Sequence, residues 1–165
     1  MEQSVSYKKL PKGNTHKCFG CSPINPHGLG MNFFAGENSV ISKIKVPEFM
    51  CGWSKLVHGG ILSVILDEIM SWAVLHILKK IVLTKSMTID YLKPVSVKNE
   101  LKAEGKPVKL INRHEVLAQV IIYDPEGNVL AKSTGKFALL TPKIALRMGI
   151  VDESSLKGIE RIIYG

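Results

Sequence analysis

The sequence contains few cysteines, and it has no apolar leader, no internal repeat and no low-complexity segment. Three cysteines are too few, and odd in number, for a framework of disulfides, and they suit the reducing conditions of the cytoplasm. The N-terminal residues lack the apolar stretch of a signal peptide, so we expect a cytoplasmic protein. A composition of 45% apolar and 22% charged residues is that of a globular protein and excludes a disordered chain, a collagen or a coiled coil.

The length of 165 residues predicts one domain with a short appendage. A chain of this size buries about 70% of the surface of its unfolded form, so its core needs neither a disulfide nor a structural metal. We expect a loose N-terminal arm over residues 1–17, a main domain over 18–142 and a C-terminal extension over 143–165. This extension is predicted to contain a short helix over 153–163, capped by Asp152.

One apolar run, from Gly59 to Leu78, has the length of a transmembrane helix. Asp67 and Glu68 lie in its middle, where a carboxylate is costly in lipid. We therefore predict a helix over residues 59–79 that is buried in protein, and no association with membranes. Glu68 points to a different face of the helix from Asp67, and we expect it to contact a second copy of the chain or to face solvent.

Strands are predicted on both sides of this helix by runs of alternating apolar and polar residues. They cover residues 29–35, 39–46, 82–92, 98–105, 109–123 and 129–141. The order ββαββββ predicts an α+β protein in which one antiparallel sheet curls around one long helix. A single sheet leaves one flank of the helix uncovered, so we expect a second copy of the chain to cover it.

The most specific motif is His58-Gly59-Gly60 at the start of the predicted helix, followed by Asp67 inside it. Glycine has no Cβ, so a ligand can approach the backbone closely, and the first N–H groups of a helix have no partner within the helix. A carbonyl oxygen bound there would be polarised, as in an oxyanion hole. Asp67 follows about two turns later and can supply a carboxylate as a base or a nucleophile, so we expect one element to provide both the carbonyl contact and the carboxylate. Each feature alone has a simpler explanation, with the glycines as a tight turn and His58 as a cap or a packed side chain.

These residues resemble the hotdog-fold acyl-CoA thioesterases of the phenylacetate type and the 4-hydroxybenzoyl-CoA type. In that family His-Gly-Gly opens the central helix and an acidic residue follows nine positions after the histidine, which is the spacing of His58 and Asp67. The Cys18-x-x-Cys21 pair and residues 25–29, NPHGL, are similar to the Cys-x-x-Cys…Asn-Pro-x-Gly-Leu lead-in of one subgroup. The resemblance extends over residues 18–141, which is most of the chain.

The resemblance implies hydrolysis of an acyl-CoA thioester to a carboxylic acid and free coenzyme A, without a cofactor. It implies that Gly59 offers its N–H to the thioester carbonyl, with His58 beside it. Asp67 would act as general base on water or as direct nucleophile. Either role of Asp67 is compatible with the resemblance.

The family also places a serine or a threonine on the strand after the helix, near the hydrolytic water. Alignment of residues 91–94, YLKP, with the Tyr-x-x-Pro of the family gives Thr84 this position, with Ser86 as the alternative. Because family sites form between two subunits, the resemblance implies a homodimer or homotetramer in which Thr84 serves the partner's Asp67. The chain departs from the pattern at Gly52, where some relatives have Asn or Gln six residues before the histidine.

Positive charge is concentrated between residues 79 and 113, where nine basic residues outnumber three acidic ones within a net charge of +8. This charge predicts a rim, with Lys93 in it, that attracts the phosphates of coenzyme A. A solvated basic face of a sheet explains any single lysine equally well. We also expect Gly60, Ser86 and Trp53 to contact the substrate. Aromatic residues are not interleaved with the basic ones, so we expect no binding of nucleic acid.

The Cys18-x-x-Cys21 pair is also a candidate zinc site, with His16, His27 and Cys51 as further donors nearby. The second pair of cysteines or histidines that a zinc ribbon requires is missing, and no thioredoxin-like context supports a redox pair. We therefore expect no metal and predict that both thiols pack in a loop near the pocket.

Two other functions remain open. A hotdog dehydratase acting on acyl-carrier thioesters needs a histidine and an acidic residue arranged to shuttle protons, and the His-Gly-Gly helix start fits that poorly. A non-catalytic acyl-CoA-binding module is the other alternative, whereas a DNA-binding regulator would need a helix-turn-helix that residues 1–17 cannot supply. Asp67 discriminates between hydrolysis and binding, because only hydrolysis requires its carboxylate.

Overall fold

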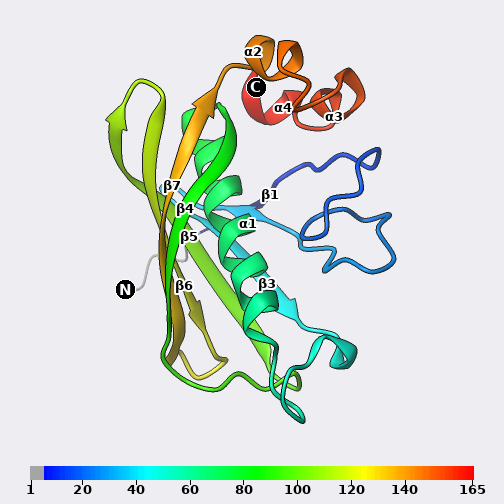
Figure 1. Cartoon of the computed structure of the whole chain (residues 1–165), viewed down its shortest axis with the longest axis vertical. Coiled ribbons are helices and arrows are strands. Elements are labelled where there is room, and N and C mark those ends of the chain that lie inside the picture. The colour runs from blue at the N-terminus through cyan, green and yellow to red at the C-terminus, as the bar shows by residue number, and fades with distance from the viewer. Residues whose placement is uncertain (1–5) are drawn as a thin grey trace.

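The protein is built from one long helix, α1 (Gly59–Leu78), and one antiparallel sheet that wraps one side of it (Figure 1). The computed structural model describes residues 6–165. Within these residues the strands are β1 (Lys8–Lys9), β2 (Phe34–Ala35), β3 (Val40–Lys45), β4 (Ile81–Tyr91), β5 (Glu100–Asn112), β6 (Glu115–Tyr123) and β7 (Val129–Leu140). They are ordered β1-β2-β3-β5-β6-β7-β4, and neighbouring strands are antiparallel. This arrangement confirms the predicted α+β hotdog architecture.

Helix α1 begins and ends at its capping residues. The His58 side chain accepts a hydrogen bond from the Gly60 N–H at the start, and Lys79 adopts a left-handed conformation (φ 57°) directly after the end. The predicted helix over 59–79 is therefore one residue too long. By length and composition α1 could cross a membrane, but nine of its residues are buried in the core of the protein. This burial confirms the prediction of a core helix.

The core lies between α1 and the inner face of the sheet. Along β6 and β7 buried residues alternate with more exposed ones, as expected for a sheet with one covered face. Trp72 of α1 stacks on Phe33 with ring centroids 4.4 Å apart, which joins the helix to the segment that leads into β2. The 3-10 helix η1 (Glu48–Met50) and the loop after it connect β3 to the start of α1.

The first predicted strand, over residues 29–35, is largely replaced by a loop, and only the last two residues form β2. Residues before β2 pair with other segments, since the Met31 N–H donates to the Gly20 carbonyl and the Leu10 N–H donates to the Phe33 carbonyl. The apolar pattern that predicts a strand here has a different origin, because Met31 and Phe33 are buried as anchors of a loop.

The strand predicted over residues 109–123 is divided by a turn at residues 113–114, so that its first residues belong to β5 and the rest to β6. The His114 N–H donates to Asn112 Oδ1 at 2.8 Å and closes this turn. The end of β5 is exposed on both faces, and alternating burial therefore gives no signal of the turn there.

The N-terminal arm is attached to the domain over the part that the structure describes, which corrects the expectation of a loose arm. β1 pairs with β2, Leu10 is buried, and the Lys12 ammonium donates to the carbonyls of Gly30 and Met31 at 3.0 and 2.8 Å. Residues 1–5 lie outside the described residues.

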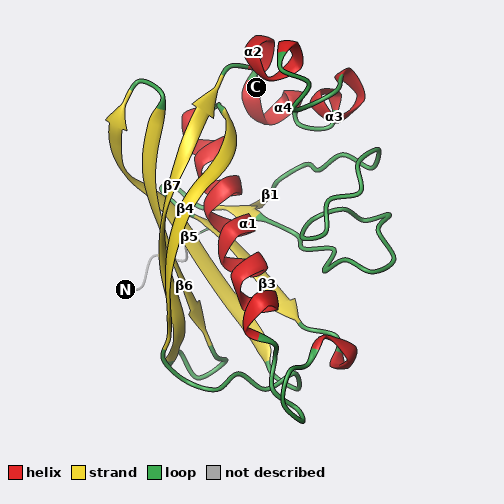
Figure 2. Ribbon diagram, viewed as in Figure 1, coloured by secondary structure: helices red, strands yellow, loops and turns green. Residues whose placement is uncertain are grey.

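Three short helices follow β7 and lie near the C-terminal end of α1, as Figure 2 shows. They are α2 (Pro142–Arg147), α3 (Glu153–Lys157) and α4 (Glu160–Ile163). The predicted cap is confirmed, because Asp152 Oδ1 accepts from the Ser155 N–H at 2.6 Å. The single helix predicted over 153–163 is instead two helices, separated at Gly158, whose backbone lies against Gly13 of the N-terminal arm.

Candidate active site

Three residues of α1, Gly59, Ser63 and Asp67, are spaced four apart and so lie in one stripe along the helix. β4 runs beside this stripe and contacts it at both ends. The Tyr91 hydroxyl donates to the Gly59 carbonyl at 3.0 Å, and the Thr84 hydroxyl donates to Asp67 Oδ1 at 2.6 Å. The stripe and the strand together bring polar groups to one edge of the sheet.

Asp67 carries a half-buried carboxyl group in surroundings that favour its proton. Burial raises the pKa of Asp67, the hydrogen bond from Thr84 opposes this rise, and the neighbouring Cys18 adds to it. A carboxylate of raised pKa with one oxygen held by a hydroxyl can accept a proton from a water molecule at its other oxygen. The Asp67–Thr84 contact lies within one chain, which corrects the expectation that Thr84 serves the partner's Asp67.

A β-bulge in β4 directs Thr84 toward α1 and Ser86 away from it. Thr84 is paired with Phe137 of β7 and Ser86 with Lys136, so Lys85 is the extra residue between them. Phe137 is buried under α1, whereas Lys136 is exposed. Ser86 therefore lies on the outer face of the sheet, and its proposed roles as an alternative to Thr84 and as a substrate contact are wrong for this chain.

The N-terminus of α1 leaves one backbone donor without an acceptor. His58 Nδ1 accepts from the Gly60 N–H at 2.9 Å, and the His58 carbonyl accepts from the N–H groups of Ile61 and Leu62. Of the N–H groups in this first turn, only that of Gly59 has no acceptor among the described residues. The Gly60 N–H is thus used by the cap, which argues against its predicted contact with substrate. Because His58 Nδ1 is an acceptor, the neutral imidazole carries its hydrogen on Nε2.

Ser63 and Tyr91 are two site residues that sequence reasoning missed as functional groups. The Ser63 hydroxyl donates to the Gly59 carbonyl at 3.0 Å and lies 2.8 Å from the Tyr91 hydroxyl. In the sequence Tyr91 is noticeable only as part of the Tyr-x-x-Pro motif, and the one signal for Ser63 is its position four residues after Gly59. These hydroxyls fix the first turn of α1 against β4.

A surface pocket of about 420 Å³ opens around Asp67 and Thr84. It is lined by Cys18, Phe19, Gly20, Ser63, Val64, Asp67, Glu68, Thr84 and Met87. None of these is a lysine, so the predicted basic rim does not surround Asp67. Two of the lysines in that stretch are instead paired with carboxylates, Lys85 with Glu115 at 2.6 Å and Lys102 with Glu104 at 3.1 Å.

Two predicted substrate contacts lie outside this pocket. Trp53 is 87% exposed in the loop before α1, and Lys93 is exposed in the loop after β4. Gly52 is the position at which the resemblance places Asn or Gln in some relatives. It lies beside the His58 imidazole, since a Cβ built there would be 3.4 Å from Cδ2 of His58. Residue 52 therefore offers no side-chain amide to the His58 imidazole in this chain.

Glu68 packs against the front loop and is only partly exposed, which corrects the expectation that it is solvated. The alternative, a contact with a second copy of the chain, stays a prediction. The Cys18 sulfur donates to Glu68 Oε1 at 3.1 Å, and Cys21 lies beside them. Burial, followed by the charge of Cys18, raises the pKa of Glu68 to about 8. The two cysteines do lie next to the pocket.

The two ends of the stripe are too far apart to act on one carbonyl group within a single chain. Gly59 and Asp67 are eight residues apart, which corresponds to about 12 Å along a helix. A thioester carbonyl that accepts from the Gly59 N–H is therefore beyond the reach of the carboxylate on the same helix. This corrects the expectation that one element of one chain supplies both groups.

Comparison with known proteins identifies the family. The thioesterase superfamily profile matches residues 55–131. A solved structure of a protein from the thioesterase superfamily is 30% identical, with a TM-score of 0.62, over 71% of this chain and 89% of its own. The chain therefore belongs to the thioesterase superfamily, and thioester hydrolysis is the general activity that this membership supports.

Two further structures show the same fold at lower identity. A hypothetical thioesterase protein with coenzyme A from Streptococcus pneumoniae is 25% identical, with a TM-score of 0.59, over 64% of this chain and 80% of its own. The Escherichia coli PaaI protein from the phenylacetic acid degradation operon is 18% identical, with a TM-score of 0.62, over 68% of this chain and 80% of its own. No curated protein sequence matches the chain.

Proposed function

We propose that the protein hydrolyses acyl-CoA thioesters to a carboxylic acid and free coenzyme A in the cytoplasm. The observation that carries the proposal is the half-buried Asp67 carboxyl group, held by Thr84 in an open pocket beside a helix that begins with an unused N–H donor. Coenzyme A as the thiol is supported by the pneumococcal relative, whose structure contains it. The thioester is activated at its carbonyl oxygen and attacked at its carbonyl carbon.

In this mechanism the Gly59 N–H donates to the carbonyl oxygen and stabilises the negative charge that develops there. Asp67 accepts a proton from water as the water oxygen bonds to the carbonyl carbon, and Thr84 keeps the carboxylate oriented. The tetrahedral intermediate then expels the coenzyme A sulfur, which receives the proton from Asp67. Direct attack by the carboxylate, followed by hydrolysis of the anhydride, gives the same products.

We propose further that each site combines Gly59 of one chain with the partner subunit's Asp67. β4 is the last strand of the sheet and is 11 residues long, with exposed apolar side chains at Leu83 and Tyr91. An edge of this kind favours pairing with another strand. Antiparallel pairing of two β4 strands about a two-fold axis near Met87 would place Thr84 of each chain opposite the partner's Tyr91.

Because of the contacts along β4, this pairing would bring together the two groups that a single chain keeps apart. Thr84 holds Asp67, and Tyr91 holds the first turn of α1 at Gly59. Strand pairing that sets Thr84 opposite the partner's Tyr91 therefore also brings Asp67 toward the partner's Gly59. The Gly59 N–H and the Asp67 carboxylate that act together would then lie on two antiparallel helices. Their separation of about 12 Å along one helix would no longer keep them apart.

The proposal is tested by the release of coenzyme A from short, medium, long and aromatic acyl-CoAs, with wild type beside Asp67→Asn. The products are separated by chromatography, because a thiol reagent would also label the three free cysteines. Turnover of at least one class by wild type, and none by the variant, supports the hydrolase. Binding of acyl-CoA without turnover of any substrate would contradict it and identify an acyl-CoA-binding module.

Replacement of Thr84 by valine is expected to lower kcat by about 10- to 100-fold, because it removes a hydrogen bond to a carboxylate worth about 1.5–3 kcal/mol. Valine keeps the shape of threonine, so the fold should be unaffected. Ser86→Ala, on the outer face of the same strand, is the matched control and should retain wild-type kcat. Equal kcat values for the two variants, measured with one acyl-CoA, would remove Thr84 from the mechanism.

A further inference from the structure

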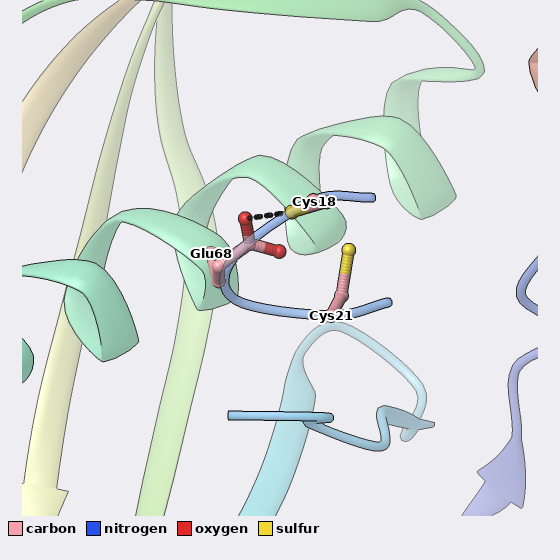
Figure 3. A group of neighbouring side chains, drawn as sticks. All are labelled: Cys18, Cys21 and Glu68. Atoms are coloured by element: carbon pink, nitrogen blue, oxygen red, sulfur yellow. Dashed lines mark hydrogen bonds between the residues drawn. The ribbon is translucent and has the colours of Figure 1, made fainter. Parts of the chain in front are cut away.

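Three metal-ligating side chains meet beside the Asp67 pocket. Cys18 and Cys21 come from the front loop and Glu68 comes from α1, as Figure 3 shows. The two sulfurs and a carboxylate oxygen all lie within 4.8 Å of one another, and Cys18 Sγ is 3.1 Å from Glu68 Oε1. Two thiolates and one carboxylate bound to a single zinc ion, at bond lengths of about 2.3 and 2.0–2.2 Å, lie about 3.5–3.8 Å apart. We propose that Cys18, Cys21 and Glu68 bind one Zn²⁺ ion.

The front loop is shaped to approach Glu68 closely. A Cβ at Gly20 would lie 2.2 Å from Glu68 Cγ, so only glycine lets the loop sit against this side chain without a shift. The Ser22 N–H donates to the Cys18 carbonyl at 3.2 Å and closes the Cys-x-x-Cys segment as a turn. In Figure 3 the Cys18 sulfur lies against a Glu68 oxygen, and the Cys21 sulfur points into the space beside them.

A metal ion would neutralise the negative charges that Cys18, Cys21 and Glu68 carry when they act as ligands. In the described residues Glu68 has no ion pair, although its carboxyl group is largely buried beside two thiols. A metal ion binds the deprotonated forms of thiols and carboxyl groups, so it would take the place of their protons here.

The neighbouring Lys12 suits the charge of a zinc complex. Its ammonium is held by the carbonyls of Gly30 and Met31, and it interacts electrostatically with both cysteines and with Glu68. Two thiolates, one carboxylate and Zn²⁺ sum to one negative charge, which Lys12 offsets. A buried charge that is paired in this way costs less than an isolated one.

The donor set favours zinc over magnesium or calcium, because thiolates are soft ligands and hard cations prefer oxygen. Cys18 and Glu68 also line the Asp67 pocket, so water can complete the coordination. The ion would fasten the front loop to α1 and so hold the wall that Cys18, Phe19 and Gly20 form beside Asp67. The third ligand, Glu68, is far from the cysteines in sequence, so the Cys-x-x-Cys spacing alone gives no sign of it.

Metal binding is measured on the reduced, chelator-treated protein by competition with a chromophoric chelator for Zn²⁺. Co²⁺ in place of zinc reports thiolate ligation through its charge-transfer absorption. Wild type is expected to bind one equivalent. Cys18→Ser, Cys21→Ser and Glu68→Gln should each weaken binding by more than about 100-fold, because even outer-shell partners contribute 10- to 100-fold. The exposed Cys51 is the matched control, and Cys51→Ser should bind as wild type does.

Two results would overturn the proposal. The first is a reduced wild-type protein that binds no Zn²⁺ in competition with the chelator. The second is a Glu68→Gln variant that binds Zn²⁺ as tightly as wild type, since the site would then be a thiol pair alone. Glu68→Gln is nearly isosteric, and its circular dichroism shows whether it is folded. Because metal binding is the readout, these results are independent of whether the protein hydrolyses acyl-CoA.

Discussion

Asp67→Asn is expected to lower kcat for acyl-CoA hydrolysis by about 10²–10⁴-fold, the contribution of a positioned general base. Asparagine has the shape of aspartate, and its amide oxygen can still accept the hydrogen bond from Thr84. The amide cannot take a proton from water, so the chemical step fails while the pocket keeps its shape. The measurement is coenzyme A release under saturating substrate, with acyl-CoA binding followed separately.

Stability provides the control for this variant. Burial raises the pKa of Asp67, so the charged carboxylate is costly in the folded protein and a neutral amide removes that cost. The free energy of unfolding of Asp67→Asn should therefore equal or exceed that of wild type. A variant that folds, binds acyl-CoA and keeps kcat within tenfold of wild type would contradict the role of Asp67.

Gly59→Pro is expected to lower kcat by about 10²–10³-fold, because it deletes the backbone N–H that polarises the thioester carbonyl. Proline is well tolerated at the first position of a helix, where the N–H has no intrahelical acceptor. His58 precedes it with φ −61° and ψ 136°, the extended conformation that a residue before proline prefers. The substitution thus removes one donor with little disturbance of α1.

Gly59→Ala separates the lost donor from added bulk. Alanine keeps the N–H, and its Cβ would have Tyr91 atoms as nearest neighbours at 3.8 Å, which is an ordinary contact. We expect kcat to fall further in Gly59→Pro than in Gly59→Ala, while thermal unfolding shows both variants to be folded. Equal kcat values for the two variants would indicate that the N–H is not used.

The architecture was predictable from sequence because its signals are local. The apolar run of α1 begins at a capping histidine, and the alternation along β3, β6 and β7 follows from one buried face of the sheet. The turn at residues 113–114 was missed because the hairpin tip projects beyond the core, where neither face is buried. The attachment of the N-terminal arm through β1 was missed because a two-residue strand has no periodicity.

The site was predictable where one helix or one motif contains it, and not where long-range contacts build it. The spacing from His58 to Asp67 placed His58 at the N-cap of α1 and Asp67 within the helix. The choice of Thr84 over Ser86 depends on a bulge at Lys85, which no local pattern reveals. The approach of Cys18 to Glu68 joins two segments that only the folded chain brings together.

The most direct test of the shared site is a mixed dimer of one Gly59→Pro chain and one Asp67→Asn chain, isolated with two affinity tags after co-expression. Light scattering first establishes that the wild-type protein is larger than its 18.2 kDa chain. If Gly59 acts with the partner's Asp67, one of the two sites in the mixed dimer is intact, and activity returns to about half that of wild type. If both groups act within one chain, both sites are defective and the mixed dimer is as inactive as its parents.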